Sequence, residues 1–142
     1  MNMNDAAPGT SPDALERLPP GECLGLLASV PVGRIVYTRQ ALPAVELVNF
    51  ALDGGDIVIR TDPGGKLAAA MQDAVVAFEA DDFDTARRYG WSVTVVGQSR
   101  EVTDPVDIAW LRTIGLRPWV MGEKEYFIRI TPGIVNGRRL AG

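Results

Sequence analysis

Short β-rich runs joined by tight turns are the feature that most constrains the fold of this chain. The runs are rich in β-branched and aromatic residues and cover residues 34–38, 43–53, 56–61, 74–83, 91–104 and 125–142. Parallel strands need long crossover connections, whereas antiparallel strands can be joined by two residues. The pattern therefore predicts a mainly β protein whose antiparallel sheet closes, or nearly closes, into a six-stranded barrel with peripheral helices.

Helix signals lie between and before these runs. Ser11-Pro12 offers one helix start and Pro20 a second, and strong helix formers follow Gly64-Gly65-Lys66. Asp104-Pro105 begins a further helix that Gly115 can end. Residues 1–11 are small and polar and are predicted to be a disordered arm, so residues 12–142 form a single domain.

Glycine and proline mark irregular points within the long strands. Gly97 is a candidate bulge in the run 91–104. The last run is predicted to be interrupted at Pro132-Gly133 and followed by a polar turn at Asn136-Gly137.

Composition excludes several classes of function. The chain of 142 residues has a net charge of −4, no histidine and one cysteine, Cys23, which is interpreted as a packed thiol on a helix. The charge does not favour nucleic acid or an anionic membrane, and a metal site would need carboxylates alone, so no metal site is predicted. No apolar run is long enough to span a membrane, and a cytoplasmic protein is predicted.

The stretch IVIRTDPGGKL, residues 57–67, carries the strongest chemical signal. Arg60 and Thr61 end a β-rich run, and Lys66 follows a Pro-Gly-Gly turn that leads into a helix. Two cations, a hydroxyl and backbone N–H groups at a helix start can together bind a phosphate. The same residues are also compatible with an ordinary solvated turn.

Three further positions have both a functional and a structural interpretation. Asn49 is polar within an apolar run, where its amide either meets a ligand edge or satisfies a backbone bend. Trp91 and Ser92 begin a long strand and either line a ligand or pack in the core. Arg138, near the end of the chain, lines a pocket or a dimer contact, or lies on plain surface.

The order of motifs resembles the pyridoxamine 5′-phosphate oxidase-like flavin-binding split-barrel family, in particular its short actinobacterial-type members. The motifs are LLASVPVGRIVYT, PAVELVNFALDGGDIVIRTDPGGKLAAA, VAFEADDFD, GWSVTVVGQSREV, PW and RITPGIVNGRR. The resemblance implies an FMN-binding split barrel that forms a homodimer with the cofactor between the subunits.

The resemblance also implies cofactor contacts. Arg60, Thr61 and Lys66 would bind the phosphate of FMN. The flavin would be approached by Val48, Asn49 and Phe50, with Ile59 beneath it. Trp91 and Ser92 would enter the site as well, possibly from the other subunit.

The implied activity is a flavin-dependent oxidoreductase acting on an unknown small molecule, with no catalytic residue assigned. Vitamin B6 oxidation is not favoured, because the chain is short, lacks histidine and lacks the C-terminal Arg-and-His pattern of that enzyme. Two alternatives stay open. A deazaflavin cofactor would be favoured by a wider basic groove involving Arg87, Arg88 or Arg138, and a non-enzymatic protein would bind or store flavin without turnover.

Overall fold

The computed structural model describes residues 15–61, 65–116 and 126–141. The strands are β1 (Leu15–Leu18), β2 (Val32–Arg39), β3 (Leu42–Asp53), β4 (Asp56–Thr61), β5 (Val75–Asp84), β6 (Tyr89–Glu101) and β7 (Tyr126–Ala141). The helices are α1 (Pro20–Leu27), α2 (Lys66–Ala70) and α3 (Pro105–Leu111), and α3 continues into the 3-10 turn η1 (Arg112–Ile114).

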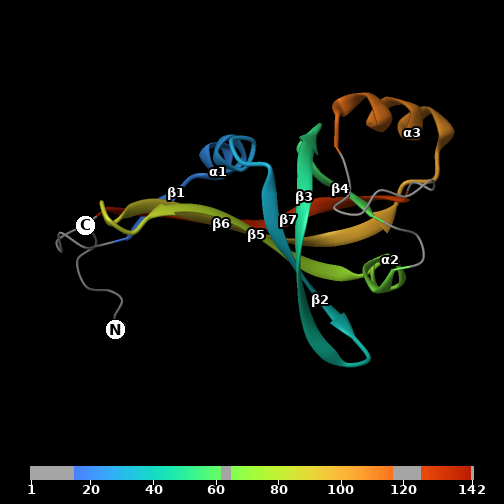
Figure 1. The fold of residues 1–142 in the computed structure, drawn as a ribbon, viewed down its shortest axis with the longest axis horizontal. Helices are drawn as coiled ribbons and strands as arrows, with labels where there is room; N and C mark the ends of the chain where they lie inside the picture. The colour runs from blue at the N-terminus through green and yellow to red at the C-terminus, as the bar shows by residue number, and fades with distance from the viewer. Residues whose placement is uncertain (1–14, 62–64, 117–125, 142) are drawn as a thin grey trace.

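The strands form one antiparallel sheet in the order β1-β7-β4-β3-β2-β5-β6. Because β6 also pairs with β7, the six strands from β2 to β7 close into a ring (Figure 1). The predicted fold, a six-stranded antiparallel split barrel with peripheral helices, is confirmed.

The hairpin between β3 and β4 follows from its glycines. Gly54 and Gly55 connect the two strands with φ angles of +60° and +87°. A two-residue hairpin turn of this hand requires positive φ at both positions, which glycine adopts without steric cost. The hairpin predicted from the Gly-Gly pair is confirmed.

The ladder between β6 and β7 contains one bulge. The pairing shifts between Val96 and Gly97, which face Ile134 and Pro132, so that Gly133 is the additional residue. A Cβ atom on Gly97 would lie 2.1 Å from a backbone oxygen of β7, which explains the need for glycine there. The irregularity predicted at Gly97 is therefore confirmed.

β7 continues past this bulge to Ala141, so the turn predicted at Asn136-Gly137 is wrong. Gly137 lies within the strand and is buried, because α1 packs directly over it. A Cβ atom at this position would come within 2.3 Å of Cys23 Sγ. The glycine permits close packing of helix on strand rather than a chain reversal.

The helix start predicted at Ser11-Pro12 does not extend into the described residues. Leu15–Leu18 form β1, which pairs with the second half of β7, with Leu18 opposite Gly137. That half of β7 is not paired with β4, so its backbone groups are satisfied by β1 instead. The arm predicted over residues 1–11 lies outside the described residues.

The barrel interior is a single apolar cluster. Phe50 and Phe78 meet edge to face in it, with ring centroids 4.7 Å apart. α1 contributes Cys23 and Leu27, which are fully buried. Burial and the nearby Glu22 raise the pKa of the Cys23 thiol, so the interpretation of this residue as a packed, unreactive thiol is confirmed.

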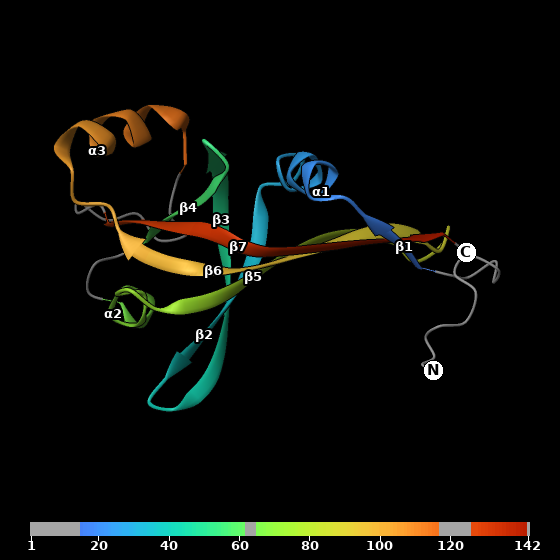
Figure 2. The same ribbon diagram turned by 180° about the vertical axis from the view of Figure 1, so that it is seen from behind.

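The elements divide between two ends of an elongated molecule. α2 and α3 lie toward one end, and β1 lies toward the other, as both views show (Figure 2). Of the helices in the described residues, none has the length and apolar character that a membrane crossing requires.

Candidate functional site

Arg60 lies near the end of β4 with its side chain on the outside of the barrel. Alternation along the strand buries Ile59 in the barrel core and places Val58 and Arg60 on the opposite face. The Arg60 guanidinium lies 5.6 Å from the centre of the Phe127 ring, and its Nη1 donates to the backbone oxygen of Leu116 at 3.2 Å. These two contacts hold a planar, forked donor group at one end of the barrel.

A second, smaller core on the outer surface of β4 and β7 supports this arrangement. Its buried members are Val58, Val102, Leu111, Leu116 and Phe127. α3 covers this surface, and its predicted start and end are confirmed. The Asp104 side chain accepts a hydrogen bond from the backbone N–H of Val106 at 2.9 Å, and Gly115 has a φ of +81°.

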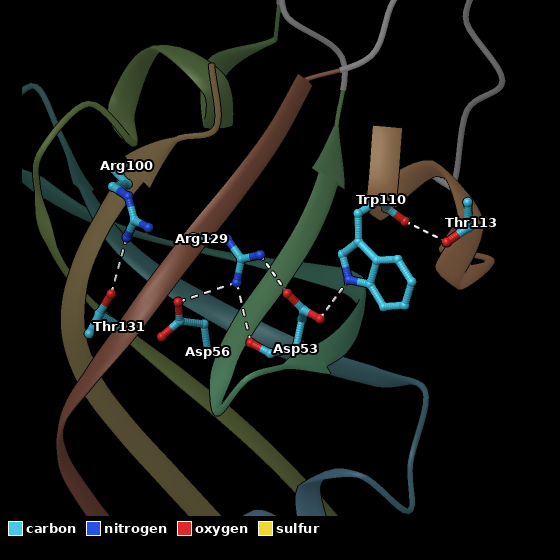
Figure 3. A network of polar contacts seen from close by, with 7 residues as sticks. All are labelled: Asp53, Asp56, Arg100, Trp110, Thr113, Arg129 and Thr131. Atoms are coloured by element: carbon cyan, nitrogen blue, oxygen red, sulfur yellow. Dashed lines mark hydrogen bonds and ion pairs between the residues drawn. The ribbon is translucent and has the colours of Figure 1, made fainter. Parts of the chain in front are cut away.

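A polar network ties α3 to the β3–β4 hairpin beside this second core (Figure 3). Arg129 on β7 donates from Nη2 to Asp53 Oδ2 and from Nη1 to Asp56 Oδ2 at 3.3 Å. Trp110 on α3 donates from Nε1 to Asp53 Oδ1 at 2.8 Å. The hydrogen bonds from Trp110 and Arg129 lower the pKa of Asp53, so its carboxylate stays charged. We call this surface, with Arg129, Asp53, Asp56 and Trp110, the covered face.

Thr61 and the start of α2 lie beside Arg60. Thr61 is half-buried and faces Tyr126 across the ladder. The Tyr126 hydroxyl donates to the Ala68 carbonyl at 3.4 Å and accepts from Gln72 Nε2 at 2.6 Å, so it joins α2 to this part of the sheet. Lys66 is the first residue of α2, and its side chain lies outside the described part of the structure. α2 has only five residues, so its dipole adds little.

The other predicted flavin contacts on β3 and β4 lie on two different faces of the sheet, the barrel interior and the outer surface. Val48, Phe50 and Ile59 direct their side chains into the barrel core, so any contact with a flavin must come from their backbone. Asn49 lies on the outer face and is half-buried. Because Phe50 faces Ile59, Asn49 and Arg60 occupy neighbouring outer positions on adjacent strands.

Trp91 and Ser92 do not lie near Arg60 in the same chain. Arg60 faces Phe127 on β7, whereas Trp91 faces Arg139, twelve positions further along that strand. At about 3.3 Å per residue, the two groups are separated by roughly 40 Å. The predicted cofactor residues therefore form two groups at opposite ends of the barrel.

Ser92 borders a cavity on the uncovered outer surface of β5, β6 and β7, whereas the Trp91 side chain packs in the barrel core and can border this cavity only through its backbone. The cavity has a volume of about 320 Å³ and is lined by Asp81, Phe83, Gly90, Trp91, Ser92, Arg138 and Leu140. Asp81, Ser92 and Arg138 lie directly opposite one another on three successive strands. We call this surface, with Arg17, which faces Arg138 on β1, the open face.

A cluster of one arginine and two carboxylates lies beside the open face. Arg34 Nη1 donates to Glu79 Oε1 at 2.9 Å and to Asp81 Oδ2 at 3.1 Å. Burial and the neighbouring Asp81 carboxylate raise the pKa of Glu79 to about 7. This cluster can therefore take up a proton near neutral pH.

Sequence reasoning missed most residues that support the two surfaces. The sequence around three of these residues indicates only a strand or a helix: Arg17, Tyr126 and Arg129. Their partners lie on distant segments, and no local pattern identifies them. Asp53 and Asp56 flank a recognisable hairpin turn, and two acids beside such a turn are the one signal that could have suggested a cation between them.

The model of the pyridoxamine 5′-phosphate oxidase family matches residues 19–139. The match covers most of the chain and includes β2 to β6 and all but the last two residues of β7. The chain therefore belongs to the pyridoxamine 5′-phosphate oxidase family, as the order of its motifs predicted.

Individual relatives agree with this assignment. The chain is 41% identical to the uncharacterized protein Rv0080 of Mycobacterium tuberculosis over 140 residues, which is 95% of this chain and 91% of that protein. It is 37% identical to the FAD binding protein from Mycobacterium smegmatis, with a TM-score of 0.80 over 89% of this chain and 99% of that one. A conserved protein of unknown function from Corynebacterium diphtheriae, 30% identical, has a TM-score of 0.76 over 92% of this chain and 100% of that one.

Proposed function

We propose that this protein binds a flavin nucleotide, FMN in the first instance, and uses it as an oxidoreductase on a small molecule. The phosphate would be held by Arg60 and Thr61 at the end of β4 and by Lys66 at the start of α2. The observation that carries the proposal is the fixed outward position of the Arg60 guanidinium on Phe127 and Leu116. Family membership and the 37% identity to an FAD binding protein support it.

The residues around Arg60 fit a phosphate group chemically. Arg60 offers a forked set of N–H donors on the outer face. Thr61, the last residue of β4, lies on the inner side with Ile59, so its hydroxyl would approach the phosphate from the end of the strand. The acidic residues on the same outer surface, Asp53 and Asp56, are bound by Arg129 and so do not oppose an anion at Arg60. The site is therefore rich in donors, with its nearby carboxylates already neutralised.

A bound flavin would supply hydride and single-electron chemistry, and the chain would bind and orient it. Asn49, on the strand beside Arg60, offers an amide that can both donate and accept hydrogen bonds at the edge of the ring system. The chain has no histidine, and its one cysteine is buried, so neither supplies acid–base chemistry at this site.

The phosphate contact is tested by comparing ligands with and without a phosphate. In Arg60→Met, which keeps an apolar stem over Phe127, we expect FMN and FAD to bind more weakly by about 1–3 kcal/mol, the scale of a charge-assisted hydrogen bond. Riboflavin, which lacks the phosphate, should bind wild type and variant equally in the same fluorescence titration. The control is Arg39→Met, which removes an exposed arginine at the end of β2, away from Arg60.

Equal FMN affinity in wild type and Arg60→Met would overturn the phosphate assignment. A deazaflavin cofactor is titrated in parallel, because tighter binding of that ligand would replace the flavin proposal. A wider basic groove for a deazaflavin would use Arg87, Arg88 or Arg138. The first two lie in the β5–β6 turn and the third on β7, so none of them lies beside Arg60 in one chain. Reoxidation of the chemically reduced, flavin-loaded protein by added acceptors separates an enzyme from a storage protein.

The same proposal includes a homodimer with the flavin between the subunits. The two groups of predicted cofactor residues are too far apart to meet one ligand in a single chain, so in this proposal a second subunit supplies one of them. An apolar stripe crosses five strands of the outer surface between these groups and consists of Val45, Val36, Ala77, Val96 and Ile134. Val45 is 61% and Ile134 58% exposed, which is unusual for a continuous apolar stripe on a monomer.

The dimer is tested by placing a charge in this stripe. Val45→Asp should convert a dimer to a monomer in light scattering and should weaken FMN binding, because each site would lose its second half. Val106→Asp changes a still more exposed valine, on α3, and should do neither. A wild-type protein that is monomeric and still binds FMN fully would contradict this part of the proposal.

A further inference from the structure

The short helix α2 depends on its surroundings for its position. It has five residues, and its N-cap residue Gly65 makes no side-chain hydrogen bond. A helix of this length is not stable alone in water. Leu67, Ala68 and Met71 are buried and attach α2 to the barrel core, but apolar burial is non-directional. The direction of α2 must therefore be set by polar contacts.

Tyr126, the first residue of β7, provides the first polar contact. It is buried, and its hydroxyl donates to the Ala68 carbonyl at 3.4 Å and accepts from Gln72 Nε2 at 2.6 Å. Burial and the Glu101 carboxylate raise the pKa of Tyr126, so the hydroxyl keeps the proton that it donates. One side chain of the sheet therefore binds both α2 and the turn that follows it.

Ser99 on β6 provides the second polar contact and is fully buried. Its Oγ lies 3.2 Å from the Met71 carbonyl oxygen and 3.0 Å from that of Ala74, and its backbone N–H donates to the same Ala74 oxygen at 2.7 Å. Between these two carbonyls, Asp73 has a φ of +51°, a left-handed conformation that costs free energy in residues other than glycine. Ser99 therefore fixes the turn by which the chain leaves α2.

The start of β7 holds both segments that carry the proposed phosphate contacts. Tyr126 and Phe127 are consecutive, so their side chains lie on opposite faces of the strand. On the outer face, the Phe127 ring lies 5.6 Å from the Arg60 guanidinium. On the inner face, Tyr126 lies opposite Thr61 and binds α2, whose first residue is Lys66. Two neighbouring residues therefore fix the end of β4 and α2 relative to each other.

We propose that Tyr126 and Ser99 are positioning residues for the flavin phosphate, which fix α2 so that Lys66 meets the phosphate bound at Arg60. This inference rests on the proposed flavin function and adds what prepares the site before the ligand arrives. Both hydroxyls are directed to carbonyl groups of α2 and the turn after it, so they act through α2 and not on the ligand. A segment already ordered in the free protein loses less conformational entropy on binding, which favours affinity.

The first test measures α2 in the protein without added flavin. Tyr126→Phe keeps the buried ring and removes the hydroxyl. Hydrogen–deuterium exchange of the Ala69 and Met71 amides, which close the first and last turns of α2, should become about fivefold faster, the scale of one net hydrogen bond. Tyr37→Phe is the control, because the hydroxyl of this buried tyrosine binds Glu46 on β3 and not α2. Equal exchange in wild type and Tyr126→Phe would overturn the proposal.

The second test compares ligands with and without a phosphate. In Tyr126→Phe and in Ser99→Ala, FMN should bind about fivefold more weakly, whereas riboflavin should bind as to wild type. Tyr37→Phe, which also removes a buried hydroxyl, should change neither affinity. Two results would overturn the positioning role: an FMN affinity that is unchanged in Tyr126→Phe, or a riboflavin affinity that falls as much as that of FMN.

A double-variant cycle tests whether Tyr126 acts through Lys66. In the Lys66→Met background, Tyr126→Phe should not change the ratio of FMN to riboflavin affinity any further, because the group that it positions is absent. Independent, additive losses would overturn the proposal. Weaker FMN binding in Arg60→Met and Lys66→Met, with Tyr126→Phe like wild type, would reject the positioning role alone. Unchanged FMN affinity in Arg60→Met and Lys66→Met would reject the phosphate site and the positioning role together.

Discussion

The two ends of β7 each bring an arginine opposite another arginine, and the protein treats the two pairs differently. Arg129 faces Arg100 on the covered face, and Arg138 faces Arg17 on the open face. The Arg129 side chain is only 11% exposed and is bound by two carboxylates under α3. No such partners hold Arg138 or Arg17 among the residues that the structure describes.

The difference follows from solvent access. A cation withdrawn from water must be paired, because the cost of burying an unpaired charge is several kcal/mol. Two exposed cations can remain opposed, because water and salt screen their repulsion. The charges of the covered face are therefore paired because they are withdrawn from water, whereas Arg17 and Arg138 on the open face can face each other because both are exposed.

The carboxylates show the same contrast. On each surface one arginine lies between two acids, Arg129 between Asp53 and Asp56 and Arg34 between Glu79 and Asp81. Hydrogen bonds lower the pKa of Asp53, whereas burial and Asp81 raise the pKa of Glu79. Asp53 is therefore held in its charged state at neutral pH, whereas Glu79 can change its charge there.

The largest expected effect comes from removing the cation of the covered face. Arg129→Met leaves two largely buried carboxylates without their partner, and we expect the free energy of unfolding to fall by about 3 kcal/mol. The matched change Arg138→Met should alter it by no more than about 0.5 kcal/mol, the range of ordinary surface substitutions. Urea denaturation of both variants at pH 7 measures the difference, and equal losses would remove the distinction between the two faces.

A smaller effect is expected from the protonation of Glu79. Its pKa rises from 4.5 to about 7 on folding, so the stability it contributes is fully present below about pH 4.5 and is lost as the pH rises through 7. Glu79→Gln, which mimics the protonated acid, should match wild type at pH 5. At pH 8 the variant should be more stable by up to about 1 kcal/mol, a value reduced for solvent screening.

Denaturation at the two pH values tests this prediction, with Glu46→Gln as the control. Glu46 is half-buried on β3 and accepts a hydrogen bond from Tyr37. Unlike Glu79, it does not share an arginine with a second carboxylate among the described residues. A Glu79→Gln curve parallel to wild type between pH 5 and pH 8 would show that Glu79 does not titrate in this range.

Local pattern was enough to predict most of the fold. Six strand runs, the Gly54-Gly55 hairpin, the bulge at Gly97 and the start of α3 all follow from short-range chemistry that acts within a few residues. β1 was missed because its four residues carry no strand signal of their own and are ordered by pairing with the distant β7. The turn predicted at Asn136-Gly137 failed because the glycine serves packing against Cys23, which the local sequence does not reveal.

The two surfaces needed the register between distant strands. Arg60 was identified as a candidate because it follows a β-rich run and precedes a glycine turn. Arg17 and Arg138 are 121 residues apart in the sequence and become neighbours only through the β1–β7 ladder. The separation of Trp91 from Arg60 likewise follows only from their partners on β7. Composition and periodicity locate strands, but they do not determine which charges face each other.

The smallest expected effect tests the arginine pair itself. Arg138→Glu places opposite charges across the β1–β7 ladder and should stabilise the protein by about 0.5 kcal/mol at low salt. Arg17→Glu should do the same, and the double variant, which restores a like-charge pair, should return to the wild-type value. The gain should vanish in 1 M salt, because exposed charges are then screened over about 3 Å. A gain that is absent at low salt, or that persists in the double variant, would show that the charges at positions 17 and 138 do not interact across the ladder.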